Sequence, residues 1–279
     1  MSDTKQSAYC TLVNNTSINN EIFRLDFAWP GASQTKFAMP KAGQFFMIKP
    51  RRSAVFLARP ISAALWKPDT RAFRKPTGLP NKFTVTFLIA RRGRGTQELA
   101  DMHPGEEAEL IGPLGNAWND FLPADGGKPI ALIGGGIGLA PLVALFGEEP
   151  QRRFILHAGF KTGFASEEEK TALLGQTLLE SQKIILATED GADGHRGLIT
   201  DFLEPEQYAA VCACGPEPML KTVTAKCKNA AVPCFVSLER KMACGVGACL
   251  GCTVRTAGGN RRCCADGPIF NADEVIFDE

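Results

Sequence analysis

The chain has 279 residues, and its 31 Lys and Arg nearly balance its 30 Asp and Glu, which leaves a formal net charge of +1. Such a balance provides no long-range field that would attract nucleic acid or an anionic membrane, and we expect neither as a partner. Hydrophobic residues make up 44% of the chain, enough for ordinary cores, and the length suggests two modest domains with an appendage. No apolar run of about 18 residues occurs, and the first ten residues lack the pattern of a signal peptide, so we expect a cytoplasmic protein.

The ten cysteines are unevenly distributed, because nine of them follow residue 211 and only Cys10 stands apart. In a reducing cytosol such a count favours metal or redox chemistry over disulfides. We therefore expect the redox chemistry of the chain at its C-terminal end.

The first hundred residues predict an all-β domain. Segments 20–29, 44–50, 82–90 and 106–113 are short, rich in β-branched and aromatic residues, and separated by Pro, Gly, Asn and Lys. Short strands without intervening helices are typical of an antiparallel barrel or sandwich. The polar, proline-bearing segment 67–82 is interpreted as an excursion between two strands.

After residues 122–128 the pattern changes to continuous apolar runs that alternate with helical stretches such as 139–148 and 166–180. This alternation indicates parallel βαβ units and a doubly wound sheet. The apolar runs occupy residues 129–136, 153–160, 183–190 and 208–216.

We thus predict a multidomain α+β chain with an antiparallel β-barrel, a doubly wound α/β domain and a small C-terminal domain. The barrel is expected at 1–112, the α/β domain at 113–235 and the C-terminal domain at 236–279. The pattern itself changes near residue 125, and the glycine turn at 111–118 is most simply a linker between the first two domains.

A glycine-rich turn, "LIGGGIGLAPL" at 132–142, joins a strand to a helix. This geometry places backbone N–H groups and a helix N-terminus against a pyrophosphate. The fingerprint G-x-G-x-x-G is only partly met: Gly134 and Gly136, or Gly136 and Gly138, fit its first two positions, and the third falls on a residue other than glycine. A tight turn without a ligand is the alternative, but four glycines exceed what such a turn requires.

Three further motifs are ambiguous when taken alone. "ACGPEPML" at 213–220 follows an apolar strand and should open onto the same crevice as the glycine-rich turn at 132–142, or it is an ordinary turn without a ligand. Arg59 can pair with a phosphate and Ser62 with a ring heteroatom, or both belong to a solvated strand end. In "ARRGRGTQEL", residues 90–99, a helix expected from Thr96 offers a second set of backbone donors for a phosphate.

The C-terminal cysteines give the most specific signal. Cys244, Cys249 and Cys252 follow the spacing C-x4-C-x2-C, and a Cys263-Cys264 pair lies downstream. This is the spacing of plant-type [2Fe–2S] ligation. Zinc is the main competitor, but structural zinc sites usually draw on C-x2-4-C pairs and often on His, and no His follows residue 195.

The remaining cysteines and the glycines of this segment have simpler interpretations. Gly245, Gly247 and Gly251 suit a loop that wraps closely around a cluster and takes positive φ angles. The other late cysteines are expected to be small buried hydrophobic residues. These are Cys212, Cys214, Cys227 and Cys234.

The order of "RPIS", "GRGT", "GPLGNAW", "GGGIGLAPL" and "CGPEPML" resembles the flavin-dependent ferredoxin-reductase superfamily over nearly the whole chain. Within it, residues 237–254 and 263–270 look like the electron transfer subunit of class 1B dihydroorotate dehydrogenase. The resemblance implies an FAD-binding barrel, an NAD-binding α/β domain and a C-terminal [2Fe–2S] domain. On this match Cys264, which precedes "DGP" by two positions, is the fourth cluster ligand, and Cys263 is a bystander.

The resemblance also implies roles for individual residues. It assigns the FAD phosphate and flavin edge to Arg59, Pro60, Ile61 and Ser62, the flavin lining to Leu88, Ile89 and Ala90, and the pyrophosphate to Gly95 and Thr96. It assigns the nicotinamide dinucleotide to Gly134, Gly135, Gly136 and Gly138, and the vicinity of the nicotinamide to Cys214, Gly215 and Pro216. It assigns the cluster to Cys244, Cys249, Cys252 and Cys264. Two features depart from the family: the excursion at 67–82 looks long, and Ala90-Arg91 replaces an expected aromatic-basic pair.

The implied function is transfer of electrons from NADH, through FAD and the [2Fe–2S] cluster, to the FMN of a dihydroorotate dehydrogenase catalytic subunit in pyrimidine biosynthesis. The family implies a heterotetramer with two copies of each subunit. His103, His157 and His195 are isolated, so no acid–base group for oxidising a dihydropyrimidine stands out. Lys161 leaves the choice between NADH and NADPH open.

Two alternatives remain at this stage. One is a reductase subunit that feeds a hydrogenase, a sulfite reductase or a ferredoxin. The other is a non-catalytic, zinc-bearing module on a degenerate reductase fold. A local excess of positive charge between residues 239 and 264, where Glu239 faces five Lys and Arg, suggests an acidic partner surface or simply a solvated loop.

Overall fold

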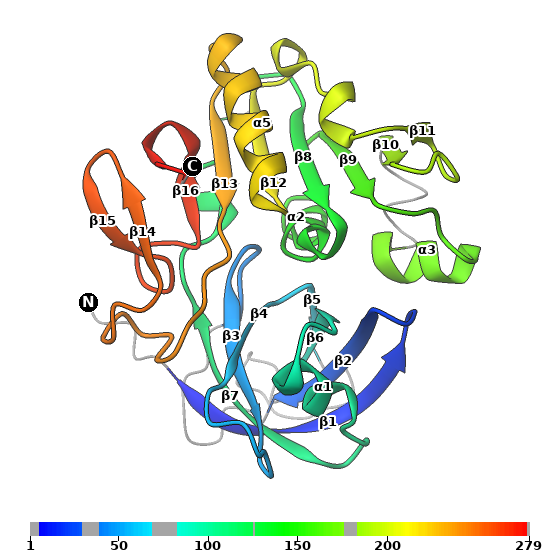
Figure 1. The fold of residues 1–279 in the computed structure, drawn as a ribbon, viewed down its shortest axis with the longest axis vertical. Helices are drawn as coiled ribbons and strands as arrows, with labels where there is room; N and C mark the ends of the chain where they lie inside the picture. The colour runs from blue at the N-terminus through cyan, green and yellow to red at the C-terminus, as the bar shows by residue number, and fades with distance from the viewer. Residues whose placement is uncertain (1–5, 30–38, 69–82, 125, 176–182, 278–279) are drawn as a thin grey trace, which may run out of the picture.

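The computed structural model describes residues 6–29, 39–68, 83–124, 126–175 and 183–277. It has three parts, with an antiparallel sheet below, a mostly parallel α/β sheet above and a small C-terminal domain beside them (Figure 1). Most of the predicted excursion, residues 69–82, lies outside the described residues. Among the described helices, none has both the length and the apolar character needed to cross a bilayer.

The N-terminal domain is a seven-stranded antiparallel sheet with the strand order β4-β3-β7-β1-β2-β6-β5. Strands β4 and β5 lie at opposite edges but are separated in sequence only by Ala63 and Ala64, so the sheet must curl until its edges approach each other. The Ala64 amide donates to the carbonyl of Thr86 in β6, 3.0 Å away. The predicted barrel is therefore confirmed as a curled antiparallel sheet. Its elements are β1 (Ser7–Ser17), β2 (Ile22–Trp29), β3 (Phe45–Pro50), β4 (Arg59–Ser62), β5 (Leu65–Pro68), β6 (Phe83–Ala90), α1 (Arg94–Ala100) and β7 (Glu107–Leu114).

The inner face of this sheet is filled by aromatic side chains. The ring of Trp29 packs edge-on against Phe46, with 5.3 Å between centroids, and stacks on Phe83 at 5.8 Å. Alternate residues of β2, β3, β6 and β7 carry core side chains inward, and these four strands correspond to the segments predicted from their β-branched and aromatic content. Strand β1 lacks a clear pattern because Cys10 and Leu12 are its only fully buried side chains.

The second domain has the strand order β11-β10-β9-β8-β12-β13-β16, in which every pair is parallel except β13 with β16. The chain leaves β8 toward β9 on one side and later returns to pair β12 on the other side. The strand order therefore reverses between β8 and β12. The elements are β8 (Ile130–Gly135), a 3-10 turn at Gly136–Leu139, α2 (Ala140–Glu148), β9 (Phe154–Phe160), α3 (Glu167–Leu174), β10 (Lys183–Thr188), β11 (His195–Arg196), β12 (Ala210–Cys214), α5 (Glu217–Asn229) and β13 (Cys234–Ser237).

Helix α3 is shorter than the helical stretch predicted at 166–180. Ser166 caps its first turn by accepting from the Glu169 amide at 3.2 Å, and the helix ends at Leu174 because Gly175 follows with φ +83°. A glycine in this left-handed conformation is a common helix stop. Residues 176–180, the rest of the predicted stretch, lie outside the described residues.

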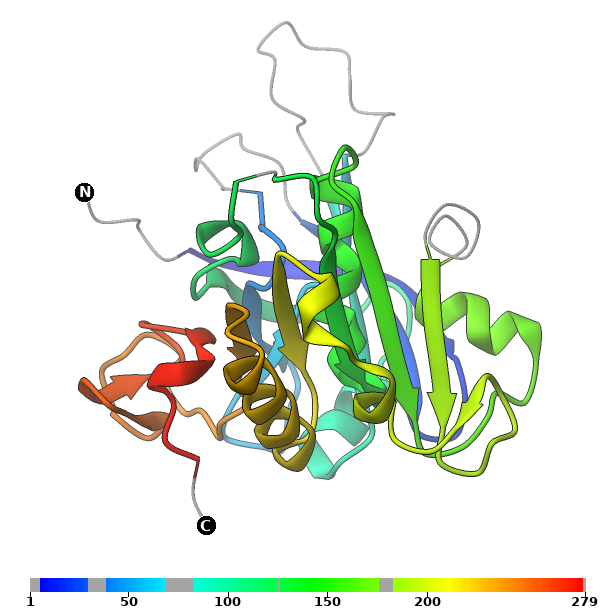
Figure 2. The same cartoon turned by 90° about the horizontal axis from the view of Figure 1, so that it is seen from above.

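The C-terminal domain lies against both other domains (Figure 2). Its hairpin consists of β14 (Thr253–Thr256) and β15 (Gly259–Arg262), and its last strand, β16 (Ile269–Asn271), returns to pair with β13. Asn116, in the segment after β7, accepts from the Ile269 amide at 3.0 Å and donates to the Ile269 carbonyl at 2.8 Å. The two domain boundaries expected at 112/113 and 235/236 fall within β7 and β13, each of which ends two residues later.

Candidate functional site

Two loops meet at the carboxyl ends of the adjacent strands β8 and β12. In the parallel register Cys214 lies opposite Gly134, so the glycine turn and the "CGPEPML" loop begin at the same level of the sheet. This is the point at which the strand order reverses, and open α/β sheets bind ligands in the crevice at such a point. The structure thus brings together two motifs that the sequence separates by about 80 residues.

The glycines of the β8 loop are required mainly by close packing. A Cβ at Gly138 would collide with the carbonyl of Cys214, and one at Gly135 would lie 2.8 Å from the ring of Pro216. Gly136 differs, because it has φ +54° and faces open space, with nothing within 4 Å of the position of a Cβ. The loop therefore joins β8 tightly to β12 and leaves one backbone segment accessible for a ligand.

Cys214 ends β12 and is buried beneath these loops, with 3% of its surface exposed. Burial, followed by the negative charge of Glu239, raises the pKa of its thiol to about 12, although a hydrogen bond with Ser237 opposes the shift. The thiol is therefore neutral at physiological pH. Cys212, Cys227 and Cys234 are also buried, as predicted.

On the barrel side, Arg59 lies against the beginning of α1. A Cβ at Gly95 would overlap the guanidinium of Arg59, so only glycine allows the side chain to cross the first helical turn. The same guanidinium donates to the Leu57 carbonyl at 3.0 Å, which fixes its direction. The first backbone amides of a helix lack partners within the helix, and an arginine beside them is a favourable setting for a phosphate.

Thr96 stabilises the loop that leads into α1. Its hydroxyl accepts from the amides of Arg92 and Gly93, at 2.9 and 3.2 Å, and donates to the carbonyl of Gly93 at 3.0 Å. The helix begins at Arg94, two residues before the expected start. The Thr96 side chain thus shapes the turn, and its backbone remains the part that would meet a phosphate.

The end of β6 lies where the barrel meets the α/β domain. Leu88 is buried in a small cluster with Ala64 of the barrel and Ala140 of α2, and Ile137 of the glycine loop packs against the cluster. Successive side chains of a strand point to opposite faces, and Ile89 lies in the barrel core. Of the three residues expected to line a flavin, Leu88 and Ala90 thus share the face toward the glycine loop, and Ile89 has only its backbone there.

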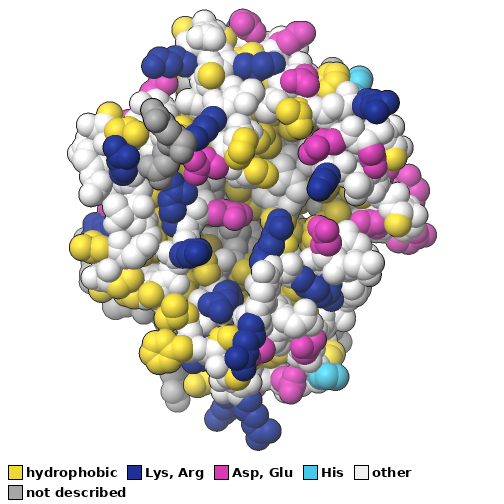
Figure 3. Space-filling model, viewed as in Figure 1, with side chains coloured by type: hydrophobic (Ala, Val, Ile, Leu, Met, Phe, Trp, Pro, Cys, Tyr) yellow, Lys and Arg dark blue, Asp and Glu magenta, His cyan; other side chains and the backbone are white. Residues whose placement is uncertain are grey.

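Lys and Arg side chains lie along the region where the upper and lower domains meet, with Asp and Glu side chains among them (Figure 3). The chain as a whole is nearly neutral, so this distribution is local. Pyrophosphates of dinucleotides are anionic, and cations on this face favour their binding.

The four cysteines predicted as ligands are arranged in two pairs. Cys244 pairs with Cys249, whose amide donates to the Cys244 sulfur at 3.4 Å, and Cys252 pairs with Cys264, whose amide donates to the Cys252 sulfur at 3.4 Å. Within the described ranges, no three His, Cys, Asp or Glu side chains are grouped tightly enough to hold one metal ion. Two pairs of thiolates are the donor set that a [2Fe–2S] cluster requires, so these residues fit such a group.

The two pairs differ in their surroundings. Cys249 is exposed and Cys244 half-buried, whereas Cys252 and Cys264 are 2% and 1% exposed. Desolvation acts against the charged form of Cys244, but hydrogen bonds from the amides of Val246 and Cys249 outweigh it and lower its pKa to about 6. Desolvation and the neighbouring Cys252 raise the pKa of Cys264 to about 12, although the Gly247 amide donates to its sulfur at 3.1 Å.

The glycines around these cysteines follow the prediction only in part. Gly245 and Gly247 take φ +66° and +81°, as expected for a loop that curls around a group. Gly251 is not among the residues with positive φ, so that part of the prediction is wrong. Leu250 takes the left-handed conformation instead, at φ +60°, and its side chain is 62% exposed.

Cys263 lies beside the pairs but is oriented differently. Its buried thiol donates to the carbonyl of Leu238 at 3.1 Å, and burial raises its pKa to about 12. This hydrogen bond gives Cys263 a partner outside the paired sulfurs.

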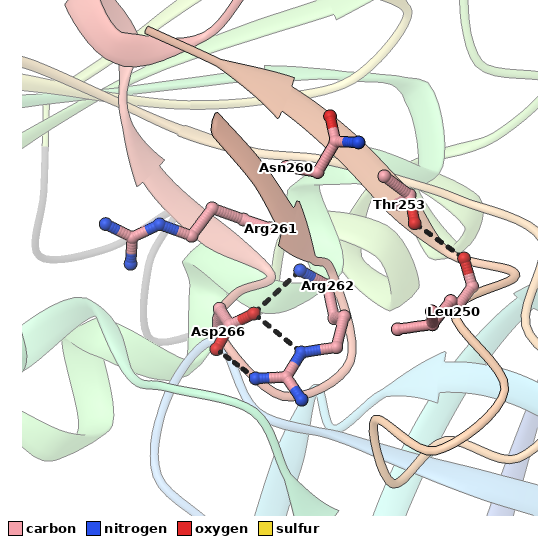
Figure 4. A pocket seen from close by; sticks show the side chains of 6 residues that line it. All are labelled: Leu250, Thr253, Asn260, Arg261, Arg262 and Asp266. Carbon is pink, nitrogen blue, oxygen red and sulfur yellow. Dashed lines mark hydrogen bonds and ion pairs between the residues drawn. The ribbon is translucent and has the colours of Figure 1, made fainter. Parts of the chain in front are cut away.

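The positive charge of this segment is smaller than the sequence suggested. Arg240 lies 3.7 Å from Glu217, and Arg262 forms hydrogen bonds through Nε and Nη2 to the two carboxylate oxygens of Asp266, each at 3.0 Å. This second pair was not predicted, although its spacing of four residues is visible in the sequence. Figure 4 shows the pair on the wall of a cavity of about 330 Å³. The cavity is lined by Leu250, Thr253, Asn260, Arg261, Arg262 and Asp266.

Comparison with known proteins agrees with this geometry. Residues 239–276 match the family described as the iron-sulfur cluster binding domain of dihydroorotate dehydrogenase B. The electron transfer subunit of dihydroorotate dehydrogenase B (NAD(+)) from Clostridium acetobutylicum is 41% identical over 195 residues, which span 70% of this chain and 75% of that protein. The corresponding subunit from Clostridium perfringens is 40% identical over 193 residues, 69% of this chain and 76% of that protein.

Solved structures show the same fold. The NADH-dependent reduced ferredoxin-NADP oxidoreductase superposes with a TM-score of 0.76 at 25% identity, covering 96% of this chain and 90% of that chain. A ferredoxin NADP+ reductase from Neisseria gonorrhoeae, with bound FAD and NADP, superposes with a TM-score of 0.59 at 18% identity, covering 80% of this chain and 91% of that chain.

The overall fold matches that of a reductase structure, and the cysteine-rich segment matches an iron–sulfur family. The chain therefore has the fold of a ferredoxin-reductase-type oxidoreductase, with a C-terminal segment that matches an iron–sulfur cluster binding domain. It belongs to the family of dihydroorotate dehydrogenase B electron transfer subunits.

Proposed function

We propose that this chain carries electrons from NADH, by way of FAD and a [2Fe–2S] cluster, to the FMN of a dihydroorotate dehydrogenase catalytic subunit in pyrimidine biosynthesis. The observation that carries the proposal is the two cysteine pairs in a chain with a reductase fold. In that fold the loops after β8 and β12 begin at the same level of the sheet. Relatives that bear the name of the electron transfer subunit of the NAD(+)-linked enzyme support NADH as the donor. We further propose a cytoplasmic heterotetramer with two copies of each subunit.

In this proposal the three segments expected from the sequence hold one cofactor each. FAD belongs to the barrel, at 1–112, NAD(H) to the α/β domain, at 113–235, and the cluster to 236–279. FAD would be held by Arg59, Pro60, Ile61, Ser62, Leu88, Ile89, Ala90, Gly95 and Thr96. NAD(H) would be held by Gly134, Gly135, Gly136, Gly138, Cys214, Gly215 and Pro216, and the cluster by Cys244, Cys249, Cys252 and Cys264.

The chain contributes positioning and charge. When bound, FAD accepts an electron pair from a nicotinamide and releases electrons singly, the form in which an iron–sulfur cluster accepts them. Arg59 presents its guanidinium to a phosphate at the start of α1, and Gly136 leaves room for the dinucleotide at the end of β8. The neutral, buried thiol of Cys214 gives the floor of the crevice an uncharged surface.

The exposed cysteine pair is the proposed exit for electrons. Cys249 is exposed, and the neighbouring Leu250 presents a large apolar side chain that is 62% exposed. An exposed apolar residue next to a redox group is suited to a partner interface. We therefore place the catalytic subunit against this edge of the C-terminal domain.

The first test compares two adjacent cysteines in protein purified anaerobically. The wild type should contain flavin, two irons and two sulfides per chain. We expect Cys264→Ala to lose at least about nine-tenths of its iron, because a cluster ligand is removed, and to keep its flavin. Cys263→Ala is the matched control and should keep both iron and flavin. One zinc per chain and no flavin in the wild type would contradict the proposal.

A second test concerns the partner and the substrate. The isolated chain should oxidise NADH with an artificial acceptor and should leave dihydroorotate unchanged. Addition of a dihydroorotate dehydrogenase catalytic subunit should couple the two activities and give a complex with two copies of each chain. Turnover of dihydroorotate by the pure chain, or preferential use of NADPH, would be evidence against the proposed assignment.

A further inference from the structure

The pair Arg262–Asp266 links two parts of the C-terminal domain. The backbone amide and Nε of Arg262 donate to Oδ2 of Asp266, at 2.7 and 3.0 Å, and Nη2 donates to Oδ1 at 3.0 Å. These bonds close the turn that carries Cys263 and Cys264 between the two charged residues. The remaining guanidinium nitrogen, Nη1, reaches the carbonyl of Gly247 at 3.5 Å.

Gly247 connects this pair to a proposed ligand. Its carbonyl faces Arg262, and its amide donates to the sulfur of Cys264 at 3.1 Å. A Cβ at this position would lie 3.4 Å from Nη1 of Arg262, so the arginine packs directly on the loop. Arg262 is also close enough to Cys252 and Cys264 for its charge to interact with both sulfurs. The guanidinium of Arg262 thus contacts the loop whose Gly247 amide donates to Cys264, and its charge acts on the sulfurs of both Cys252 and Cys264.

We infer that Arg262 is a positioning residue that raises the reduction potential of the cluster, and that Asp266 limits this effect. Reduction adds negative charge to a cluster, and nearby charge is one of the factors that set its potential. A guanidinium beside the buried sulfurs favours the reduced form, and a carboxylate beside the guanidinium disfavours it. The inference rests on the proposed cluster ligation and adds a determinant of its potential.

The expected shift in the reduction potential is limited by the solvent exposure of the two charged side chains. The side chain of Arg262 is 42% exposed and that of Asp266 is 23% exposed, so water screens both charges. We expect a charge screened in this way to change the ratio of reduced to oxidised cluster by about threefold. For transfer of one electron, a threefold change is about 30 mV.

The test is a redox titration, monitored by electron paramagnetic resonance, of the full chain with its cofactors. Arg262→Gln should lower the midpoint potential by about 30 mV, and Asp266→Asn should raise it by a similar amount. Arg262→Lys keeps the charge and should remain near the wild type. The control is Arg261→Gln, which makes the same charge change on the same hairpin, but at a side chain directed away from Asp266 (Figure 4). It should shift the potential by less than half as much.

Opposite signs distinguish the inference from a purely structural role. If the pair only braced the loop, Arg262→Gln and Asp266→Asn would shift the potential in the same direction, and the inference would be overturned. An equally large effect of Arg261→Gln would also overturn it. If Arg262→Gln lost its cluster, Asp266→Asn would decide, because a shift that is absent or downward contradicts the inference. Iron and sulfide analysis of the wild type tests the proposed ligation separately.

Discussion

The glycine-rich loops at 134–138 and 245–251 look alike in sequence, but glycine serves different purposes in them. In the first loop, side chains are excluded mainly by neighbouring atoms, as at Gly138 under the Cys214 carbonyl. In the second loop, Gly245 and Gly247 are required by positive φ angles as well as by contacts. Close packing joins two strands of one sheet, whereas the backbone reversals turn amides toward sulfur atoms. The first loop is therefore sensitive to volume, and the second to backbone conformation.

The largest effect is expected at the first loop. Gly138→Ala places a methyl group against a β12 carbonyl, and relieving the collision must separate the two switch-point loops. Such overpacking costs about 1–3 kcal/mol. We expect the KM for NADH to rise about tenfold in an assay with an artificial acceptor, and iron content to stay at the wild-type level. Unchanged KM would show that the loops are not joined through this contact.

A smaller effect is expected at the second loop. Gly247→Ala must adopt φ +81°, which costs about 1–2 kcal/mol for a residue with a Cβ, and its methyl group would lie 2.9 Å from that of Ala265. We expect faster loss of iron on warming and an unchanged KM for NADH. Gly251→Ala is the matched control, because its Cβ would make only an ordinary contact, 3.6 Å from the Cys249 sulfur. Equal iron loss in both variants would contradict the distinction.

The smallest effect is expected at Leu250. Leu250→Gly removes the strain of a left-handed leucine, a gain of about 1 kcal/mol that greater freedom of the unfolded chain partly offsets. Thermal stability should therefore change by no more than a few degrees, while transfer to the catalytic subunit weakens through loss of an exposed apolar contact. Melting temperature and partner titration measure the two effects. A stability loss comparable to that of Gly247→Ala would show that the side chain packs within the domain.

Much of the fold was predictable because its strands have simple hydrophobic patterns. The aromatic alternation of β2 and β6 and the continuous apolar runs of β8 and β12 indicate their faces directly. Strand β1 was missed because most of its side chains are exposed or half-buried. Strand β16 was missed because three residues are too few to show a hydrophobic pattern. Its pairing with β13 also joins segments that are far apart in the sequence.

The candidate cluster site was predictable from the spacing of its cysteines in the sequence. Cys244, Cys249 and Cys252 lie close together in the chain, so their proximity in space follows. Which way Cys263 points depends on the Leu238 carbonyl, and sequence does not reveal that contact. Nor does it show that Asn116 holds the segment after the cysteines, since its partners lie about 150 residues away.

The antiparallel pairing of β16 with β13 makes the cluster domain an insertion at a sheet edge rather than a tail. The chain leaves the sheet at Ser237 and comes back to it at Ile269, and these two residues are partners in the ladder. Both ends of the domain are thus anchored beside β13. Removing everything after residue 236 would expose an unpaired strand edge and remove the hydrogen-bond partners of Asn116. A shorter enzyme that keeps only the first two domains would need its own means of covering that edge.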